Sequence, residues 1–465
     1  MEHRPLGFVL EATGAELVRG DRSARVERVV TDSRAVRAGD LFVALAGERF
    51  DGHEFVLAAA RAGAVAVMVR RGASIPDDPG CGVLAVEETR QALGRLAARY
   101  RAELDLRVIA VAGSNGKTTT KELLASVVRQ RFNTHCSPAS YNNEVGVPLT
   151  LLGLDRAHQV AVVEAGTNHP GELAGLLEMI RPDWGVMTSI GREHLEYFGD
   201  LEGVIAEESE LARCLPEGGR LFLLGDHPAA SVIAARTRAE WVRVGVGEEN
   251  DWRLGVTRYE GGGMFFEVDT GRWGLSGGYR VNLVGRHQVL NAVLAMAVGA
   301  ELGLDREEVG RGLAECGGAP RRMQLWEGQG IRVLDDSYNA NADSTLAALQ
   351  TLVDLPCQGR RMAWLGDMAE LGAASEPAHA EIGRRAAELG VDQLSAVGSM
   401  AGVMGAAARA AGLNRVVELA TPEAAAHAVR RLVRRGDLVL VKASRATRLE
   451  QVSDALRTEA RNGAE

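Results

Sequence analysis

Short apolar runs alternate with segments of helical length through the middle of the chain. The runs lie at 106–111, 160–163, 185–188 and 220–224. Strands separated by helices are typical of βαβ units, which form a parallel sheet with helices on both of its faces. We therefore predict a central α/β domain over residues 106–318.

The two flanking parts show the same alternation. Residues 1–105 contain short strand-like runs and alanine-rich helical patterns, which predict a smaller domain. Residues 319–465 open with an apolar run at 331–334, end with one at 437–442 and hold another at 361–365. This spacing predicts a doubly wound, Rossmann-like domain. The whole chain is thus predicted to be an α/β protein with three domains.

One stretch departs from this pattern. Residues 250–282 lose the helical period, and the string Gly261-Gly262-Gly263 supplies a turn within them. We expect a β-meander inserted into the central domain.

Composition narrows the class of protein. The chain has 465 residues, of which 46% are hydrophobic and 25% charged, as in an ordinary globular protein. Its net charge of −9 argues against a nucleic-acid-binding protein. The five cysteines are scattered without a C-x-x-C pair, which favours reduced thiols in a cytoplasmic protein. No apolar run is long enough to span a bilayer, so we expect a cytoplasmic protein without membrane insertion. We also expect a monomer.

The most informative motif is a glycine loop between a predicted strand and a predicted helix at 121–128. Its residues are Gly113, Ser114, Asn115, Gly116, Lys117, Thr118 and Thr119. Such a loop directs backbone N–H groups and a helix N-terminus at one point, where phosphate binds. The longer G-x-x-x-x-G-K-[ST] form would need a glycine where this chain has Val111. We predict that Lys117 reaches the outer phosphates of a nucleotide and that the Thr118 hydroxyl ligates Mg²⁺.

Lysine is rare elsewhere in the chain. There are fifty arginines but only three lysines, Lys117, Lys121 and Lys442. Arginine presents a planar fork, whereas lysine presents a compact point charge. We interpret the three lysines as positions where the point charge matters.

Two further candidates follow predicted strands. Glu164 ends the run at 160–163, and His194 follows the run at 185–188. Both therefore lie at the carboxyl edge of a parallel sheet, where ligands gather. A carboxylate suits Mg²⁺, which is a hard cation. Taken alone, Glu164 is equally typical of a helix cap, and a single histidine is usually structural.

The order of these motifs along nearly the whole chain resembles that of the Mur ligase family. These enzymes use ATP to form the amide bonds of the peptidoglycan peptide stem. The resemblance is carried by the strings at 31–34, 50–53 and 141–150, by Asp-Asp-Ser-Tyr-Asn-Ala-Asn at 335–341 and by Gly-Asp-Met-Ala-Glu-Leu-Gly at 366–372. The last two strings are most similar to those of the branch that adds D-alanyl-D-alanine to UDP-N-acetylmuramoyl-tripeptide.

The resemblance implies roles for residues of all three domains. The UDP end of the substrate would lie against Ser33, Arg34, Asp51, Gly52 and His53. ATP would be bound by residues Gly113 to Thr119, with His287 and Asn291 near adenine and with Arg322 and Asp336 closing over the nucleotide. The peptide substrates would lie against Asn142, Asn143, Asn339 and Asn341. Lys117, Glu164 and His194 would be catalytic, and Thr118, Glu164 and His194 would hold Mg²⁺.

One position departs from the family pattern. The resemblance implies a lysine, carbamylated by CO₂, in the helix after the His-Leu-Glu segment, where it helps to hold a second Mg²⁺. The aligned residue here is Glu208, and no lysine occurs from 122 to 441. Arginine stays protonated and does not take up CO₂. We predict that the Glu208 carboxylate binds Mg²⁺ directly. The alternative is that Glu208 is one charge of an exposed acidic run at 207–210.

Two other functions remain open at this point. One is a sister ligase that adds a different amino acid, or glutamate as in folylpolyglutamate synthesis. The string Asp-Asn-Pro-Arg, usual in the diaminopimelate-adding branch, is absent from this sequence. The other is a non-ligating ATP-binding subunit of a cell-wall complex, against which the intact Lys117, Thr118, Glu164 and His194 argue.

Overall fold

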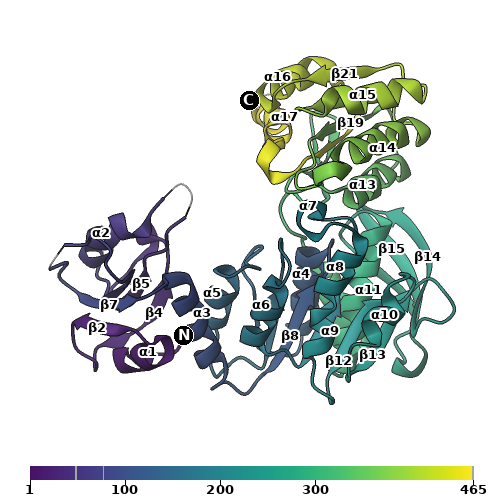
Figure 1. Ribbon diagram of the computed structural model, residues 1–465. Helices are drawn as coiled ribbons and strands as arrows, with labels where there is room; N and C mark the ends of the chain where they lie inside the picture. The colour runs from purple at the N-terminus through teal and green to yellow at the C-terminus, as the bar shows by residue number, and fades with distance from the viewer. Residues whose placement is uncertain (48–49, 77, 463–465) are drawn as a thin grey trace.

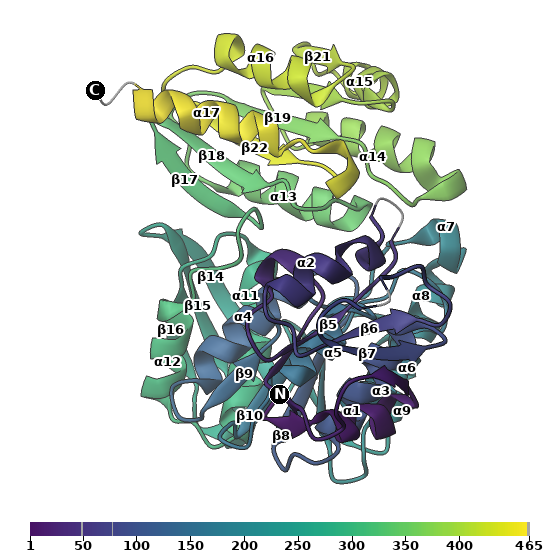
Figure 2. The ribbon, with the colours of Figure 1, turned by 90° about the vertical axis from the view of Figure 1, so that its left-hand side faces the viewer.

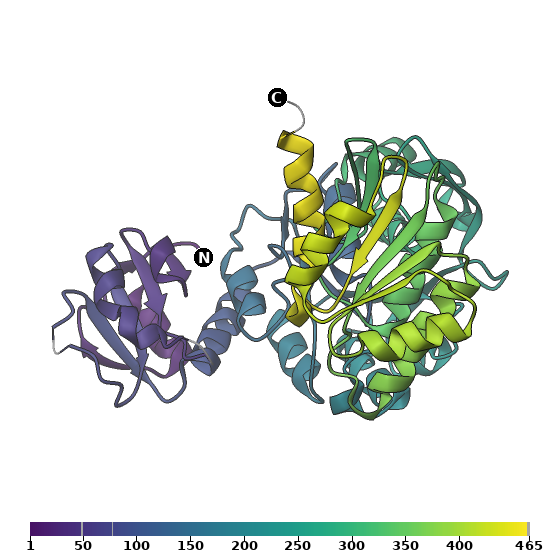
Figure 3. The same ribbon diagram turned by 90° about the horizontal axis from the view of Figure 1, so that it is seen from above.

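Three α/β parts follow one another along the chain, each with its own sheet, which confirms the predicted fold class (Figure 1). The computed structural model describes residues 1–47, 50–76 and 78–462. The N-terminal part lies to one side of the central part, and the C-terminal part lies above it (Figures 1 and 3). Within the described ranges, the structure contains no helix long and apolar enough to cross a membrane.

The N-terminal sheet has the strand order β2-β7-β6-β5-β4. Strand β2 is antiparallel to β7, and the other neighbours are parallel. The elements are β1 (Arg4–Pro5), α1 (Leu6–Thr13), β2 (Glu16–Arg19), β3 (Arg25–Val26), β4 (Arg28–Val30), β5 (Asp40–Val43), α2 (Val56–Arg61), β6 (Ala66–Arg70), β7 (Gly82–Val86) and α3 (Thr89–Arg101), with 3-10 helices at Ser33–Ala35 and Gly52–Phe55.

The central sheet has the strand order β16-β15-β14-β13-β12-β11-β8-β10-β9. Its strands are β8 (Arg107–Ala112), β9 (Thr134–Cys136), β10 (Val160–Glu164), β11 (Trp184–Met187), β12 (Arg220–Leu224), β13 (Glu240–Gly245), β14 (Trp252–Glu260), β15 (Gly263–Asp269) and β16 (Gly277–Val281). Its helices are α4 (Lys117–Val128), α5 (Gly146–Leu152), α6 (Glu172–Ile180), α7 (Leu195–Phe198), α8 (Leu201–Glu208), α9 (Glu210–Cys214), α10 (Ala230–Ala234), α11 (Arg286–Glu301) and α12 (Arg306–Glu315), with a 3-10 helix at Gly271–Trp273.

The glycine loop connects β8 with α4, as predicted. In β8, residues 108–112 are buried, so this strand lies at the centre of the core. Helix α4 begins at Lys117, four residues before the predicted start. Gly116 precedes it with φ +87°, a left-handed conformation that glycine adopts without strain. The helix can therefore begin directly after the loop, which brings its N-terminus to the loop's centre.

The predicted β-meander forms, but it is not an isolated insertion. Strands β14, β15 and β16 are antiparallel neighbours, and Gly261 and Gly262 make the first turn with positive φ. The start of β14 also pairs in parallel with the end of β13. Since β13 would otherwise leave an open sheet edge, the meander extends the central sheet.

The C-terminal sheet has the strand order β17-β18-β22-β19-β20-β21, in which β17 alone is antiparallel to its neighbour. Helices α13 and α14 lie nearest to the central part (Figure 2). The elements are β17 (Gln324–Gly328), β18 (Ile331–Asp336), α13 (Ala342–Asp354), β19 (Arg361–Gly366), α14 (Ser375–Glu388), β20 (Gln393–Val397), α15 (Ala401–Ala410), β21 (Val416–Leu419), α16 (Pro422–Leu432), β22 (Leu438–Lys442) and α17 (Glu450–Asn462), with 3-10 helices at Gly372–Ala374 and Arg445–Thr447.

Candidate functional site

A cavity of about 2120 Å³ lies where the carboxyl ends of the central strands meet the C-terminal part. Its lining includes Lys117 from the glycine loop, Glu164 at the end of β10 and Asn341 at the start of α13. It continues along helices α3 and α6. Pockets for one drug-sized ligand usually measure about 300–1,000 Å³, so this cavity has room for more than one substrate.

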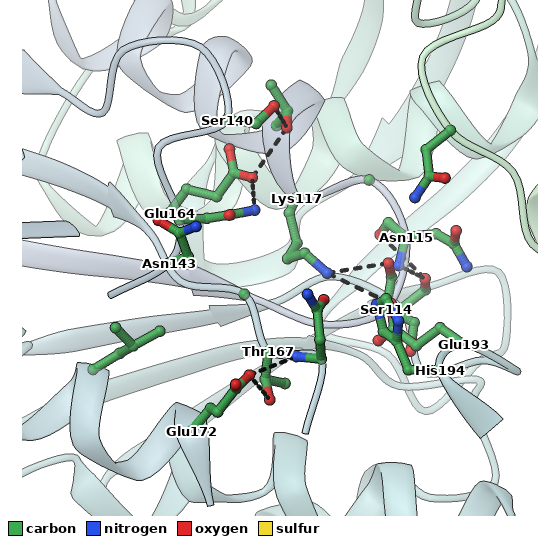
Figure 4. Close-up of a pocket in the computed structure, with 18 of the residues that line it drawn as sticks. Ser114, Asn115, Lys117, Ser140, Asn143, Glu164, Thr167, Glu172, Glu193 and His194 are labelled. Atoms are coloured by element: carbon green, nitrogen blue, oxygen red, sulfur yellow. Dashed lines mark hydrogen bonds and ion pairs between the residues drawn. The ribbon is translucent and has the colours of Figure 1, made fainter. Parts of the chain in front are cut away.

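Lys117 stands at the centre of this cavity. Its ammonium group donates hydrogen bonds to the carbonyl oxygens of Gly113 and Ser114, and it lies 3.7 Å from a carboxylate oxygen of Glu193. Figure 4 shows Lys117 between Glu164 on one side and Glu193 with His194 on the other. The ammonium group thus lies against the backbone of the glycine loop. A bound phosphate group would replace the two carbonyl oxygens as its hydrogen-bond partner.

Several carboxylates surround this amine. Burial lowers the pKa of Lys117, but three carboxylates, of which Glu193 acts most strongly, outweigh burial and raise it above its ordinary value. Glu193 itself is only 5% exposed. Lys117 therefore stays protonated, which is the state that attracts phosphate oxygens.

Glu208 is buried and not part of an exposed acidic run. It is 1% exposed, and neither of its carboxylate oxygens has a hydrogen-bond partner in the described structure. Burial raises the pKa of Glu208 to about 8, while the charge of Lys117 opposes this shift. A buried carboxylate without a partner is costly, which indicates a cationic ligand or an ordered water at this position.

The neighbouring Glu207 has a different role. Its carboxylate accepts hydrogen bonds from the Thr167 hydroxyl and from the backbone N–H groups of Gly171 and Leu173. These groups belong to the loop after β10 and to the first turn of α6. Glu207 therefore fixes the loop that follows Glu164. Glu208 does not line the cavity, but it lies near Lys117 and the backbone N–H of Gly113 in the phosphate loop.

Thr118 and Glu164 meet at the other side of Lys117. The Thr118 hydroxyl donates to Glu164 Oε1 at 3.1 Å, and the Asn142 amide donates to the same oxygen at 2.9 Å. The second oxygen of Glu164 is buried and has no partner among the described residues. Asn143 uses its side-chain oxygen to accept from the backbone N–H groups of Val145 and Gly146, and it also lines the cavity.

His194 is bound to the C-terminal part. Its Nδ1 donates to the carboxylate of Glu370, and its Nε2 lies 3.8 Å from Glu193. In the described ranges, no three acidic, histidine or cysteine side chains converge as a preformed metal centre. The predicted set of Thr118, Glu164, His194 and Glu208 thus surrounds Lys117 without forming one ready-made cluster.

The residues expected near adenine lie at the start of α11. Asn291 is 6% exposed and donates to Gln288. A Cβ atom at Gly116 would come within 2.8 Å of the Asn291 side chain, so the loop needs glycine there to pack against α11. Burial lowers the pKa of His287 to about 4, which keeps this ring neutral. Both His287 and Asn291 line the cavity.

The C-terminal residues reach the phosphate loop. Asn341 caps α13 and donates from its amide to Asn115 Oδ1 at 2.9 Å. Arg322 donates to the Ser140 hydroxyl at 3.2 Å, and its guanidinium lies 4.1 Å from the centre of the Tyr338 ring. Asp336 and Asn339 also line the cavity.

Lys117 and Lys442 line this cavity, and Lys121 lies behind its wall. Lys121 is fully buried and donates to the carbonyl oxygens of Ser137 and Ala139, which shapes the loop that carries Ser140. Lys442 donates to the carboxylate of Asp336 and to the carbonyl oxygen of Asn339. The rarity of lysine thus indicated Lys442, which lines the cavity, and Lys121, which supports the loop beside it.

The residues expected to hold the UDP end lie apart from this cavity. None of Ser33, Arg34, Asp51, Gly52 and His53 is among its lining residues. His53 is 8% exposed, and both of its ring nitrogens are used, since Nδ1 donates to Asp51 and Nε2 accepts from the backbone N–H of Arg70. A Cβ at Gly52 would lie 2.7 Å from the Leu45 nitrogen. In this structure His53 and Gly52 therefore have structural roles.

Three other site residues had no clear signal in the sequence. Glu193 precedes His194, and Ser140 lies two residues before Asn142, but no pattern in the sequence marked either of them as a site residue. Glu370 was part of a recognised motif, but its contact with His194 depends on how the two parts of the chain meet. Contacts between distant segments have no local pattern that could indicate them.

Comparison with known proteins agrees with this arrangement. Family models match residues 25–101 (Mur ligase family, catalytic domain), 111–299 (Mur ligase middle domain) and 321–445 (Mur ligase, glutamate ligase domain). The UDP-N-acetylmuramoyl-tripeptide–D-alanyl-D-alanine ligase of Bacillus subtilis is 34% identical, over 94% of this chain and 96% of that protein. The ligase of the same name from Escherichia coli is 36% identical, over 93% and 94%.

Solved structures show the same similarity over the whole length. A crystal structure of MurF from Acinetobacter baumannii superimposes with a TM-score of 0.87 at 30% identity, covering 98% of this chain and 99% of that one. The MurF ligase of Thermotoga maritima, solved in complex with ADP, gives a TM-score of 0.80 at 29% identity, covering 94% and 98%. The chain therefore belongs to the Mur ligase family.

Proposed function

We propose that this protein is an ATP-dependent ligase that joins D-alanyl-D-alanine to UDP-N-acetylmuramoyl-tripeptide in peptidoglycan precursor synthesis. The observation that carries this proposal is the cavity itself. It joins a phosphate-binding loop to the C-terminal strings at 335–341 and 366–372 and has room for several substrates. The names of the full-length relatives from Bacillus subtilis and Escherichia coli support the same substrates.

ATP would bind with its phosphates in the loop from Gly113 to Thr119. The backbone N–H groups of the loop and the N-terminus of α4 would face the phosphates, and Lys117 would move from the loop carbonyls to the phosphate oxygens. Asn291 and His287 would lie beside the base and ribose. The Thermotoga maritima relative, solved with ADP, supports nucleotide binding at this fold.

The residues present fit Mg²⁺ as a cofactor. Glu208 offers two buried oxygens without partners and Glu164 offers one, and carboxylate oxygens are the ligands that Mg²⁺ prefers. Thr118, Glu164, Glu208 and His194 would hold it, together with phosphate oxygens and water. Mg²⁺ commonly uses only one or two carboxylates plus phosphates, so a preformed cluster is not required. When bound, Mg²⁺ would neutralise the charge that develops on the transferred phosphoryl group.

The chemistry requires two steps. A carboxylate is a poor electrophile, so a carboxylate oxygen of the tripeptide first attacks the γ-phosphorus of ATP, and ADP leaves. The neutral amine of D-alanyl-D-alanine then attacks the carbonyl carbon of the acyl phosphate, and phosphate leaves from the tetrahedral intermediate. Lys117 would hold the transferred group in place through its fixed positive charge.

Water must be kept away from the acyl phosphate. The C-terminal part already contacts the phosphate loop through Asn341, and Arg322 covers the opposite side at Ser140. Asn142, Asn339 and Asn341 would present amide groups to the peptide backbone of the substrates. If the C-terminal part covers the site before phosphoryl transfer, it limits hydrolysis of the acyl phosphate.

Release of inorganic phosphate tests this function directly. The purified protein with ATP, Mg²⁺ and UDP-N-acetylmuramoyl-tripeptide should release phosphate in proportion to product only when D-alanyl-D-alanine is added. Glutamate or single amino acids in its place serve as controls and should give background rates. Turnover with glutamate would support the folylpolyglutamate-type alternative. Absence of turnover with any amine would favour a non-ligating ATP-binding protein.

A further inference from the structure

A group of charged side chains joins the central and C-terminal parts beside the phosphate loop. Arg192 follows β11, and it contacts Asp343 at the start of α13 and Glu381 on α14. We call Arg192, Asp343 and Glu381 the interdomain clamp. None of these residues has a role in the chemistry described above.

Arg192 binds its partners through both backbone and side chain. Its backbone N–H donates to Asp343 Oδ2 at 2.7 Å, and its Nε and one terminal nitrogen donate to Oδ1 at 3.0 and 2.8 Å. The other terminal nitrogen donates to Glu381 at 2.7 Å. This geometry uses the planar fork of arginine, which a lysine cannot reproduce.

The backbone next to Arg192 is fitted to this contact. A Cβ atom at Gly191 would lie 2.6 Å from Asp343 Oδ2 and 3.4 Å from the Asn115 side chain. Glycine at this position therefore lets α13 approach the central sheet. The same approach brings Asn341, two residues before Asp343, to Asn115 of the phosphate loop.

We propose that Arg192 is a positioning residue, which holds the C-terminal part in the orientation that places Asn341 on the phosphate loop. The clamp acts without nucleotide, because its bonds join protein groups only. This proposal rests on the proposed function in one respect only, which is the effect of the clamp on ATP binding. The clamp would favour the arrangement in which Asn341 contacts the phosphate loop over an open arrangement in which Asn341 lies away from it. The affinity for ATP would rise as a result.

The clamp is distinguishable from ordinary surface ion pairs. Isolated exposed pairs contribute little to stability, whereas a fork that makes several bonds across an interface can bias its closure. The three side chains are about one-third exposed, at 36%, 36% and 28%. Salt should therefore weaken the clamp.

Small-angle X-ray scattering of the unlabelled, full-length protein without ligands tests the clamp. Arg192→Ala and Asp343→Ala should each increase the radius of gyration, and the double variant should show no further increase, because both changes remove the same interaction. Arg192→Lys should recover part of the compact form. Raising the salt concentration should expand the unmodified protein but not Arg192→Ala. The matched control is Arg384→Ala, which removes an ion pair with Glu388 within α14 and should change nothing.

Steady-state kinetics give a second readout. We expect KM for ATP to rise about three- to tenfold in Arg192→Ala, with a smaller change in kcat, since the variant retains the reacting groups. Unchanged scattering in Arg192→Ala and Asp343→Ala would overturn the proposal, as would an equal change in Arg384→Ala. The scattering needs no substrate. An expansion of the variants therefore supports the clamp even if the unmodified protein proves not to ligate D-alanyl-D-alanine.

Discussion

At the scale of single residues, the site depends on lysine where the rest of the chain uses arginine. Lys117 is enclosed by the loop carbonyls of Gly113 and Ser114 and by Glu193. A guanidinium is wider and planar, so it cannot occupy the same enclosed space as a point charge. The sequence indicated this residue through its motif, and the structure supplies the enclosure that explains why its size matters.

We expect Lys117→Arg to abolish ligation although the charge is kept. The rate should fall more than tenfold, which corresponds to a barrier increase above about 1.4 kcal/mol. Phosphate release measures the rate, and thermal unfolding checks that the variant still folds. A rate above a tenth of that of the unmodified protein would contradict the phosphate-binding role of Lys117.

Glu208 gives the second prediction at this scale. Because its two oxygens are buried without partners, Glu208→Ala should severely weaken activity and raise the Mg²⁺ concentration required. Activity of the unmodified protein should not depend on bicarbonate, since a carboxylate needs no CO₂. A Mg²⁺ titration with and without bicarbonate measures both. The matched control is Glu210→Ala on the next helix, whose carboxylate pairs with Arg213. If Glu208→Ala were as active as the unmodified protein at every Mg²⁺ concentration, Glu208 would not bind Mg²⁺.

At the scale of elements, the sequence predicted the strands that carry the site and missed many of the others. β8, β10, β11 and β12 form close to the predicted runs, because buried parallel strands are continuous apolar segments. Shorter or more polar strands such as β9 and β17 gave no such signal. The alternative for Glu208 was an exposed acidic run at 207–210. In the structure, however, Glu207, Glu208 and Ser209 are buried. Periodicity alone cannot show which polar residues are buried against a distant loop.

Glu207 allows a test at this scale. Glu207→Ala would leave the backbone N–H groups of Gly171 and Leu173 without their acceptor, whereas the Thr167 hydroxyl would still donate to the His169 carbonyl oxygen. Hydrogen bonds to charged groups contribute about 1.5–3 kcal/mol, so we expect the free energy of unfolding to fall by about 2–4 kcal/mol. Urea denaturation measures this change, and Glu210→Ala should stay within about 0.5 kcal/mol of the unmodified protein. Equal stability of the two variants would refute the role of Glu207 in fixing the loop.

At the scale of the whole molecule, the first two parts of the chain share apolar packing. Helix α3 packs on α5 and α6, and Leu93, Leu96 and Tyr100 are fully buried in a core cluster that continues into the central part. The Tyr100 hydroxyl donates to the Leu154 carbonyl oxygen at 2.7 Å. The expected boundary at residue 105 stays a prediction. Helix α3 also packs on α1 of the N-terminal part, but more of its packing is with α5 and α6 of the central part. Sequence patterns assigned α3 to the first part because it follows the strands of that part without a break.

Two truncations separate these assignments. Removing residues 1–87 leaves α3 with its capping residue Glu88, so we expect residues 88–465 to fold, to bind ATP and to lose affinity for the UDP-substrate. Removing residues 1–105 would expose the faces of α5 and α6. Each large apolar side chain lost from that contact contributes about 1.5–3 kcal/mol, so this shorter chain should unfold at a lower temperature or aggregate. Calorimetric titration with ATP and with the UDP-substrate, together with thermal unfolding of both chains, measures these outcomes. Equal thermal stability of the two chains would show that α3 does not belong to the central core. Retained UDP-substrate affinity in residues 88–465 would show instead that the first part is not the UDP-binding domain.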